Sequence, residues 1–384
     1  LEITKAINNN LSIESILKIF EYILREQLGI SKLILYANDS KKWNCILHFG
    51  VKGLNKKINV EEELTHIKDI TVIESSSIKT LNSFDIVIPI FHKKIALAYV
   101  LIGDLEDDII AISPGIKHMP FIQTLASIIV VAIENKRYSK ELLEQEVNKK
   151  EMELAAEMQK LLFPINLPND ESFDVAARYE SKHLVGGDYY DFFEQPDGSL
   201  YAICGDATGH GTPSGMLVSI TKAGIIGLPQ MSPKDMLHEL NRVVKKVDLG
   251  ILRMSLNIAL IKDNQITLSS AGMPPYFIYR AATNTSEEIQ LSGVPLGSFN
   301  DVHFDQTSTS FNTGDILVII SDGLPEAPNL AGELFDYQKL QDLITTYGNK
   351  TAQEVIDQLM MEADAWLSGN HNPDDITLVV IKHK

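Results

Sequence analysis

The sequence predicts an α+β protein in which a long helix joins two domains. Its 384 residues exceed what one hydrophobic core usually spans, and 45% of them are hydrophobic. An almost unbroken helical pattern separates two regions that are rich in short apolar strands. In the second region the strands follow one another as hairpins and the helices are grouped apart, which favours a sandwich over a parallel doubly wound sheet. We expect an N-terminal domain over 1–120, a helical linker over 121–162 and a second domain over 163–384.

The N-terminal domain is expected to form one small sheet flanked by helices. Residues 12–28 place their apolar side chains on one stripe, behind Ser12 as a helix N-cap. Strand candidates follow at KLILYAN, NCILHFG, DIVIPIF and IALAYVLIGD. A turn-like stretch around 113–115 then leads into a helix near Pro120. This order of elements predicts a small α/β domain.

The helical linker carries an incomplete heptad repeat. Its two seams consist of Ile133, Val147, Leu154 and Leu161 at one position, and of Ile129 and Leu143 at the other. Lysines at positions 136, 140 and 150 interrupt the repeat. A solvated helix that packs on its own domain is the alternative. We favour a partial coiled coil that joins two copies of the chain into a homodimer.

The second domain begins after the linker, which Pro164 and Pro168 are expected to end. Its predicted strands are FDVAARYE, SLYAICGD, LNIALIKDNQITLSSAG, PYFIYRA, DILVIISDG and the closing DDITLVVIK. The Asp263-Asn264 pair predicts a hairpin turn. Helices are expected over 213–227, 233–247, 337–347 and 351–367.

Charge and cysteine content argue against several classes of partner. A net charge of −17 disfavours nonspecific binding to nucleic acids or anionic membranes. The two cysteines, Cys45 and Cys204, form no CxxC motif or disulfide framework, which fits a reducing cytoplasm. No apolar run approaches the roughly 20 residues of a membrane span. The chain begins at Leu1 and not at methionine, so a sensor or membrane anchor further upstream stays open.

Aspartates stand where strands of the second domain begin or end. Asp188 follows a Val-Gly-Gly run, Asp206 follows YAICG, Asp322 follows ILVIIS, and Asp374 and Asp375 precede the last strand. One such residue would be a turn former, but several can converge, and clustered carboxylates resist ionisation unless a cation compensates. Oxygen ligands without a cysteine or a histidine pair suit Mg²⁺ or Mn²⁺ better than zinc. Two such ions could polarise a phosphoryl group and activate a water.

Competing motifs are incomplete. GDATGHG lacks the GxxxxGK[ST] pattern of a P-loop, and its second half matches only part of a dinucleotide fingerprint. GGDYY resembles the start of a diguanylate cyclase signature, but Tyr-Tyr replaces Glu-Phe, which disfavours a nucleotide-cyclising enzyme. His210 stands alone in its turn, and a turn histidine is more often structural than catalytic.

Six ordered motifs of the second domain resemble one bacterial enzyme family. VGGDYYDFF, GDATGHGTPSGM, SSAGMPPYFIY, GVPLG, GDILVIISDGLPEA and PDDITLVVI follow one another as in the PPM (type 2C-like) serine phosphatases of the SpoIIE/RsbU branch. The preceding EMQKLLFPINLP is similar to the helix that leads into that domain, so the resemblance covers roughly 155–384. It implies an αββα sandwich and a Mg/Mn-dependent phosphoprotein phosphatase with two Mn²⁺ or Mg²⁺ ions.

The resemblance also implies roles for individual residues. Asp206 would bridge both ions, with the backbone carbonyl of Ala207 assisting. Asp322 and Asp374 would complete the shell of one ion, and Asp188 would bind a metal or its water. Water would then attack the phosphoserine phosphorus in line, with no phosphoenzyme.

The sequence departs from the family pattern in two places. Met273 stands where many relatives have a histidine, and His183 stands before VGGD where eukaryotic relatives hold phosphate with an arginine. The phosphate-binding residue is therefore unassigned. Asp375 is expected to lie outside the metal shells, although its adjacency to Asp374 leaves that register open.

The family resemblance implies a substrate and a regulator as well. Members of this branch typically act on a phosphoserine or phosphothreonine of a small STAS-domain anti-sigma-factor antagonist. The first domain more loosely resembles a GAF sensor domain, with a small-molecule ligand and a ligand-free dimerising module both open. A catalytically silent phosphatase-fold scaffold is the main alternative, and the presence of all four ligand aspartates counts against it.

Overall fold

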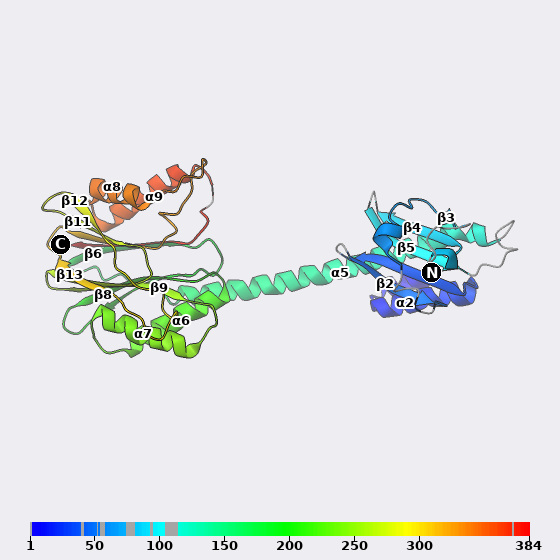
Figure 1. The fold of residues 1–384 in the computed structure, drawn as a ribbon, viewed down its shortest axis with the longest axis horizontal. Helices are drawn as coiled ribbons and strands as arrows, with labels where there is room; N and C mark the ends of the chain where they lie inside the picture. The colour runs from blue at the N-terminus through cyan, green and yellow to red at the C-terminus, as the bar shows by residue number, and fades with distance from the viewer. Residues whose placement is uncertain are drawn as a thin grey trace. The chain divides into compact units, whose positions relative to one another are not determined.

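A computed structural model of the chain describes most of its length. The described residues are 2–39, 42–51, 53, 58–73, 81–92, 95–103, 114–370 and 372–384. The chain divides into two compact units, residues 1–146 and 147–384, and the division falls within the long helix α5 (Pro114–Lys160) (Figure 1). The three-part division at 120/121 and 162/163 stays a prediction. Within the described ranges, none of the helices combines the length and the apolar character that crossing a membrane requires.

The first unit contains a five-stranded antiparallel sheet in the order β2-β1-β5-β4-β3. Its strands are β1 (Lys32–Asp39), β2 (Lys42–Phe49), β3 (Thr71–Val72), β4 (Ile86–His92) and β5 (Ile95–Gly103). Its shorter helices are α1 (Glu2–Asn8), α2 (Ile13–Tyr22), the π-helix η1 (Ile23–Gln27), α3 (Val60–Glu63) and the 3₁₀-helix η3 (Leu81–Ser83). The predicted cap of the second helix is confirmed, since the Ser12 side chain accepts a hydrogen bond from the Ser15 N–H.

The first part of α5 belongs to the core of the first unit. Ile129 and Ile133 are buried there beside residues of α2 and of the sheet, including Phe20 and Val100. The prediction that these two isoleucines lie on an intermolecular seam is therefore wrong, because their own unit covers them. The other seam residues, Leu143, Val147, Leu154 and Leu161, are exposed.

The start of α5 also differs from the prediction. The helix begins at Pro114, with Pro120 inside it, whereas the sequence suggested a turn around 113–115 and a start near Pro120. Position 113 lies outside the described residues. Proline is favoured in the first turn of a helix, which made Pro120 a plausible start, yet its exposed ring is accommodated in the second turn of α5.

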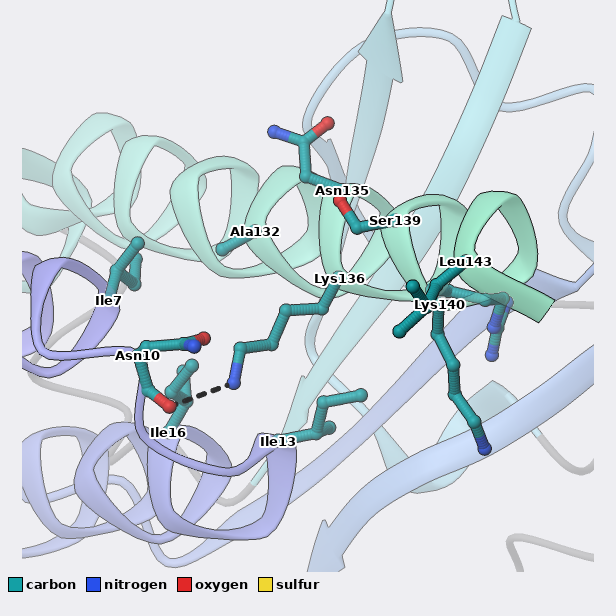
Figure 2. A pocket seen from close by; sticks show the side chains of 11 residues that line it. Ile7, Asn10, Ile13, Ile16, Ala132, Asn135, Lys136, Ser139, Lys140 and Leu143 are labelled. Carbon is teal, nitrogen blue, oxygen red and sulfur yellow. Dashed lines mark hydrogen bonds between the residues drawn. The ribbon is translucent and has the colours of Figure 1, made fainter. Parts of the chain in front are cut away.

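A cleft of about 800 Å³ lies between the N-terminal helices and α5 within the first unit (Figure 2). The isoleucines of one wall come from α1 and α2, and polar side chains of α5 face them. The Lys136 ammonium spans the cleft and donates hydrogen bonds to the main-chain carbonyls of Asn10, at 3.1 Å, and Leu11. The lysine that interrupted the heptad repeat therefore holds the N-terminal helices to α5.

The second unit is a four-layer sandwich of two five-stranded sheets between two helix pairs (Figure 1). The first sheet has the order β13-β10-β9-β8-β7, with β7 (Asp188–Glu194), β8 (Leu200–Ala207), β9 (Met254–Lys262), β10 (Gln265–Ala271) and β13 (Gln306–Ser310). The second has the order β12-β11-β14-β15-β6, with β6 (Phe173–Glu180), β11 (Tyr276–Arg280), β12 (Thr285–Ile289), β14 (Ile316–Ile320) and β15 (Ile376–His383). Helices α6 (Thr212–Gly227) and α7 (Pro233–Val247) cover the first sheet, and α8 (Tyr337–Tyr347) and α9 (Ala352–Leu367) cover the second.

Three layers of apolar side chains hold the sandwich together. The facing sides of the two sheets meet in a core that includes Cys204, Leu268, Ile319 and Val379, all fully buried. Two further cores lie between each sheet and its helix pair. Strands β8, β14 and β15 are therefore covered on both faces, which explains why they read as continuous apolar runs.

The predicted elements of this unit are largely confirmed, and the exceptions share a cause. All four predicted helices form, and Lys262 pairs with Gln265 around the predicted two-residue turn, where Asp263 has a φ of 51°. The strand expected to begin at Asp188 is β7, whereas β12 and β13 were not predicted. Both are sheet edges with mostly polar, exposed residues, which lack an apolar signal.

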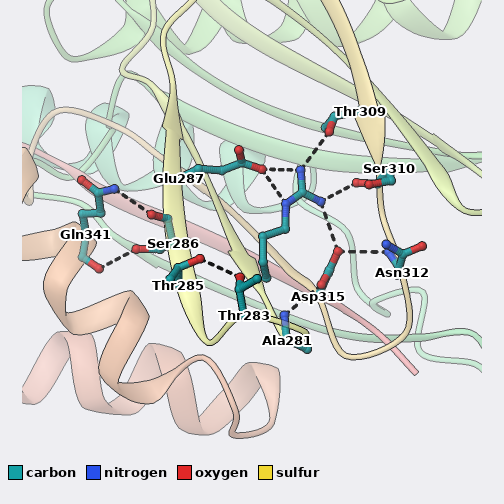
Figure 3. Close-up of polar contacts among 11 residues, drawn as sticks. Ala281, Thr283, Thr285, Ser286, Glu287, Thr309, Ser310, Asn312, Asp315 and Gln341 are labelled. Atoms are coloured by element: carbon teal, nitrogen blue, oxygen red, sulfur yellow. Dashed lines mark hydrogen bonds and ion pairs between the residues drawn. The ribbon is translucent and has the colours of Figure 1, made fainter.

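An arginine fork ties the two sheets together at one edge (Figure 3). Arg280 on β11 pairs with Glu287 on β12 and, at 3.1 Å, with Asp315. The same two terminal nitrogens also donate to residues of β13 in the other sheet: Nη2 to Thr309 Oγ1, at 2.9 Å, and Nη1 to the Ser310 carbonyl. Because a guanidinium presents several donors in one plane, a single side chain can bind both sheets.

Candidate active site

The end of the first sheet brings two aspartates face to face. Asp188 is the first residue of β7, and the strand register pairs it directly with Asp206 near the end of β8. The backbone is tight here, since a Cβ on Gly187 would lie 2.5 Å from the Ala207 carbonyl oxygen and 2.8 Å from Asp206 Oδ1. No side chain fits at position 187 without displacing the backbone, which accounts for the glycine.

The second sheet brings its aspartates to one end by strand pairing. Asp322 lies just beyond β14, and Asp374 and Asp375 directly precede β15. These strands are antiparallel, so the end of one lies beside the start of the other. A Cβ on Gly323 would lie 1.8 Å from the Asp375 carbonyl oxygen, so the two segments touch through their backbones.

A threonine joins the two sheets at the site. Thr377 on β15 is fully buried, and its Oγ1 donates a hydrogen bond of 2.6 Å to Asp188 Oδ2 on β7. Its own N–H donates to Ser321 Oγ at 2.9 Å. Aspartates that come from different sheets are thus brought to the same end of the sandwich.

The adjacent aspartates at the start of β15 have different surroundings. Asp375 is 5% exposed, and its two oxygens accept main-chain hydrogen bonds of 2.7 Å from Lys182 and Gly187. Asp374 is exposed, and its Oδ1 accepts from the Asp375 N–H. Asp375 therefore fixes the loop that precedes Asp188, while the Asp374 side chain reaches solvent.

The carboxylates of the site repel one another. Burial, followed by the charges of Asp188 and Asp322, raises the pKa of Asp206 to about 9. Burial also raises the pKa of Asp188 to about 8, against the hydrogen bonds from Thr377 and Ser321 that favour its ionised form. The pKa of Asp322 rises to about 6 through burial and then the charge of Asp374. Each group resists ionisation first because it is removed from water and then because of its neighbours' charges.

The donor set of this site fits hard divalent cations. In the part of the chain that the structure describes, none of these aspartates forms an ion pair with lysine or arginine, so their repulsion is not offset by protein charge. Oxygen-only ligands favour Mg²⁺ or Mn²⁺. No three His, Cys, Asp or Glu side chains of the described residues stand close enough to hold an ion by themselves, so backbone carbonyls and water would have to complete the ligand set.

The last turns of α5 hold the loop that carries Asp188. The Gln159 side chain is 5% exposed; its Nε2 donates to the Gly186 carbonyl at 2.8 Å, and its Oε1 accepts from the Gly186 N–H at 3.1 Å. Lys222 on α6 donates to the Leu162 carbonyl and to Asp191 Oδ2, both at 2.6 Å. The helix end, the loop and the first sheet are thus joined by polar contacts.

Sequence reasoning missed several of these residues. Thr377 lies inside an apolar run and Gln159 on a polar helix, and neither pattern marks a site. The expectation that His210 stands alone is wrong, because its ring stacks on His183 with centroids 3.8 Å apart. Met273, which replaces a histidine of many relatives, is buried in the core between the sheets.

Comparisons with known proteins point to one family. The family described as "Stage II sporulation protein E (SpoIIE)" matches residues 196–384. "Phosphoserine phosphatase RsbU" of Bacillus subtilis (strain 168) is 32% identical over 251 residues, which are 63% of this chain and 72% of that protein. "Phosphoserine phosphatase RsbP" of the same organism is 22% identical over 244 residues, 62% of this chain and 58% of that protein. The solved "SiaA-PP2C domain of Pseudomonas aeruginosa" has a TM-score of 0.56 at 16% identity, over 63% of this chain and 99% of that one.

The four-layer sandwich, with carboxylates at the meeting ends of both sheets, has a PP2C-like fold. The chain belongs to the SpoIIE/RsbU branch of the PPM serine/threonine phosphatases, a family of metal-dependent enzymes. The expected αββα fold of the second domain is confirmed.

Gln159 should be required for an ordered site. Replacing it in Gln159→Ala removes two hydrogen bonds to Gly186, and we expect a loss of about 1–2 kcal/mol in the unfolding free energy of the second unit. Because Asp188 lies two residues further on, half-saturation by Mn²⁺ should also need several-fold more metal, as measured by calorimetric titration. Glu157→Ala, an exposed change on the same helix, is the matched control. Equal metal affinity in both variants would show that this contact does not support the site.

Proposed function

We propose that the second unit is a Mg²⁺- or Mn²⁺-dependent phosphoprotein phosphatase that hydrolyses phosphoserine or phosphothreonine. The observation that carries this proposal is the cluster of carboxylates from two sheets, with Asp188 buried and Asp206 and Asp322 half-buried. Their mutual repulsion is offset by no described lysine or arginine. Such a cluster weakens the fold unless a cation binds it. Membership of the SpoIIE/RsbU family supports the same enzymatic function.

Each site residue has a proposed role. Asp206 would bridge two ions, with the Ala207 carbonyl as a further ligand; Asp322 and Asp374 would complete one ion's shell, and Asp188 would bind a metal or its water. When bound, such ions supply positive charge to a phosphoryl group and acidify a ligated water.

The surrounding residues would orient these ligands. The hydrogen bond from Thr377 fixes one oxygen of Asp188 and leaves the other free to face the ions. Both oxygens of Asp375 are taken by main-chain N–H groups, so this residue would position the loop and not bind metal. This assignment agrees with the register expected from the family motif.

Replacing a proposed ligand aspartate by asparagine should lower the activity with metal, and for Asp206 it should raise the stability without metal. Asp206→Asn and Asp322→Asn should each lower Mn²⁺-dependent hydrolysis of p-nitrophenyl phosphate by orders of magnitude, because a ligand charge is lost. In EDTA at pH 7, Asp206→Asn should raise the melting temperature by at least about 2 °C, equivalent to about 1 kcal/mol for a domain of this size. The reason is that a carboxylate ionised in the unfolded chain resists ionisation when folded.

Asp263→Asn, in an exposed hairpin turn of the same unit, is the matched control and should change neither property. Near-wild-type turnover in both ligand variants would overturn the binuclear site. Absence of metal-dependent turnover in the wild-type chain, with metal binding intact, would favour the catalytically silent scaffold.

The substrate is proposed to be a folded phosphoprotein of the STAS-domain type. The relatives RsbU and RsbP are named phosphoserine phosphatases, which supports the amino acid that carries the phosphate. A chain with a net charge of −17 repels phosphorylated proteins in general, so specificity would come from docking around the site. We expect a higher kcat/KM for a folded phospho-STAS protein than for its isolated phosphopeptide. Equal values would exclude docking, and a preference for phosphotyrosine or a nucleotide would exclude the substrate class.

The first unit is proposed to be a GAF-like sensor that controls the phosphatase through α5. The cleft in Figure 2 offers a place for a small-molecule ligand, and a ligand could shift the enzyme only by binding its two states differently.

We also propose a homodimer through the exposed apolar residues of 143–161, which a seam between two helices would cover. Light scattering should give twice the chain mass at micromolar concentration; a monomer would refute the dimer.

A further inference from the structure

A stacked pair of histidines lies at the rim of the site. The rings of His183 and His210 are 3.8 Å apart between centroids and 23° from parallel. Their segments are the continuations of β7 and β8 past the facing aspartate pair, and they stay together: the Gly211 N–H donates to the Val185 carbonyl at 2.9 Å. The stack therefore lies on the same two chain segments that carry the facing aspartates.

The neighbouring basic side chains contact main-chain carbonyls. Lys182 Nζ donates to the Pro373 carbonyl, and one terminal nitrogen of Arg253, Nη1, donates to the carbonyls of Gly250 and Leu252. By contrast, neither His183 nor His210 makes a hydrogen bond to another residue that the structure describes, although both reach the surface. Each imidazole carries at least one N–H, so the pair offers donors without a protein acceptor.

We infer that His183 and His210 together bind the phosphate group of the substrate, a phosphomonoester dianion. The inference rests on the proposed phosphatase function and assigns the phosphate-binding residues that the sequence left open. A dianion that approaches five aspartates needs hydrogen-bond donors in addition to the ions, because the surrounding protein charge repels it. Two stacked rings present their N–H edges side by side, which matches an acceptor group with several oxygens.

The experiment separates donor function from ring stacking. Phenylalanine keeps an aromatic ring but has no donor, whereas glutamine keeps an N–H donor but cannot stack as a ring. Four variants of the full chain, loaded with Mg²⁺, are compared: His183→Phe, His210→Phe, His183→Gln and His210→Gln. The dissociation constant of inorganic phosphate is measured by calorimetric titration. KM and kcat are measured with p-nitrophenyl phosphate as the substrate.

Loss of a donor to a charged acceptor should weaken phosphate binding about tenfold in each phenylalanine variant, and glutamine should restore it to within about threefold. KM should rise by similar factors, with a smaller change in kcat. His303→Phe, at an exposed histidine of the same unit that pairs with Asp305, should match the wild type.

Wild-type phosphate affinity in both phenylalanine variants would overturn the inference. Weaker phosphate binding by the glutamine variants than by the phenylalanine variants would also overturn it, because the stacked rings would then have a structural role. The proposed function is judged separately by turnover in the wild-type chain. If that turnover is absent while the phenylalanine variants still lose phosphate, the enzyme assignment fails and the phosphate site stands.

Discussion

Repulsion among buried and half-buried carboxylates is the constraint on which the rest of the phosphatase unit depends. Asp188 and Asp206 face each other across two paired strands, and Asp322 reaches the same end of the sandwich from the other sheet. Left alone, these charges would push the sheet ends apart. The structure opposes that repulsion with short contacts: a threonine hydroxyl bonds Asp188, and main-chain N–H groups bond Asp375. Each such charge-assisted hydrogen bond contributes about 1.5–3 kcal/mol.

This arrangement supports the loop before Asp188 from two sides. Asp375 holds it from the second sheet, and Gln159 holds it from the end of α5. Lys222 then ties the same helix end to Asp191 on β7, and the side chains of both residues are largely buried. A shift of the helix end would break polar contacts that cannot be replaced by water in a buried setting. The position of Asp188 is therefore coupled to the helix.

Much of this site could be predicted because aspartates and their positions at strand ends are local signals. The aspartates, the flanking glycines and the apolar runs were visible along the chain, and the four helices of the sandwich formed where their patterns indicated. What the sequence did not show depends on register. His210 meets His183 only because β7 and β8 pair as they do.

The linker also shows what a sequence pattern alone cannot determine, namely which surface an apolar stripe packs against. Its heptad pattern is real, yet it cannot tell a helix that packs on its own domain from one that packs on a second copy, since both need an apolar stripe. In this chain the stripe divides: Ile129 and Ile133 are covered by the first unit, whereas Leu154 and Leu161 are exposed. The change comes before the segment that contacts the phosphatase loop through Gln159. An event that covers the exposed part of the stripe would thus act on the same helix segment that positions Asp188. Because the aspartates repel one another, the position of Asp188 would be sensitive to small displacements of that segment.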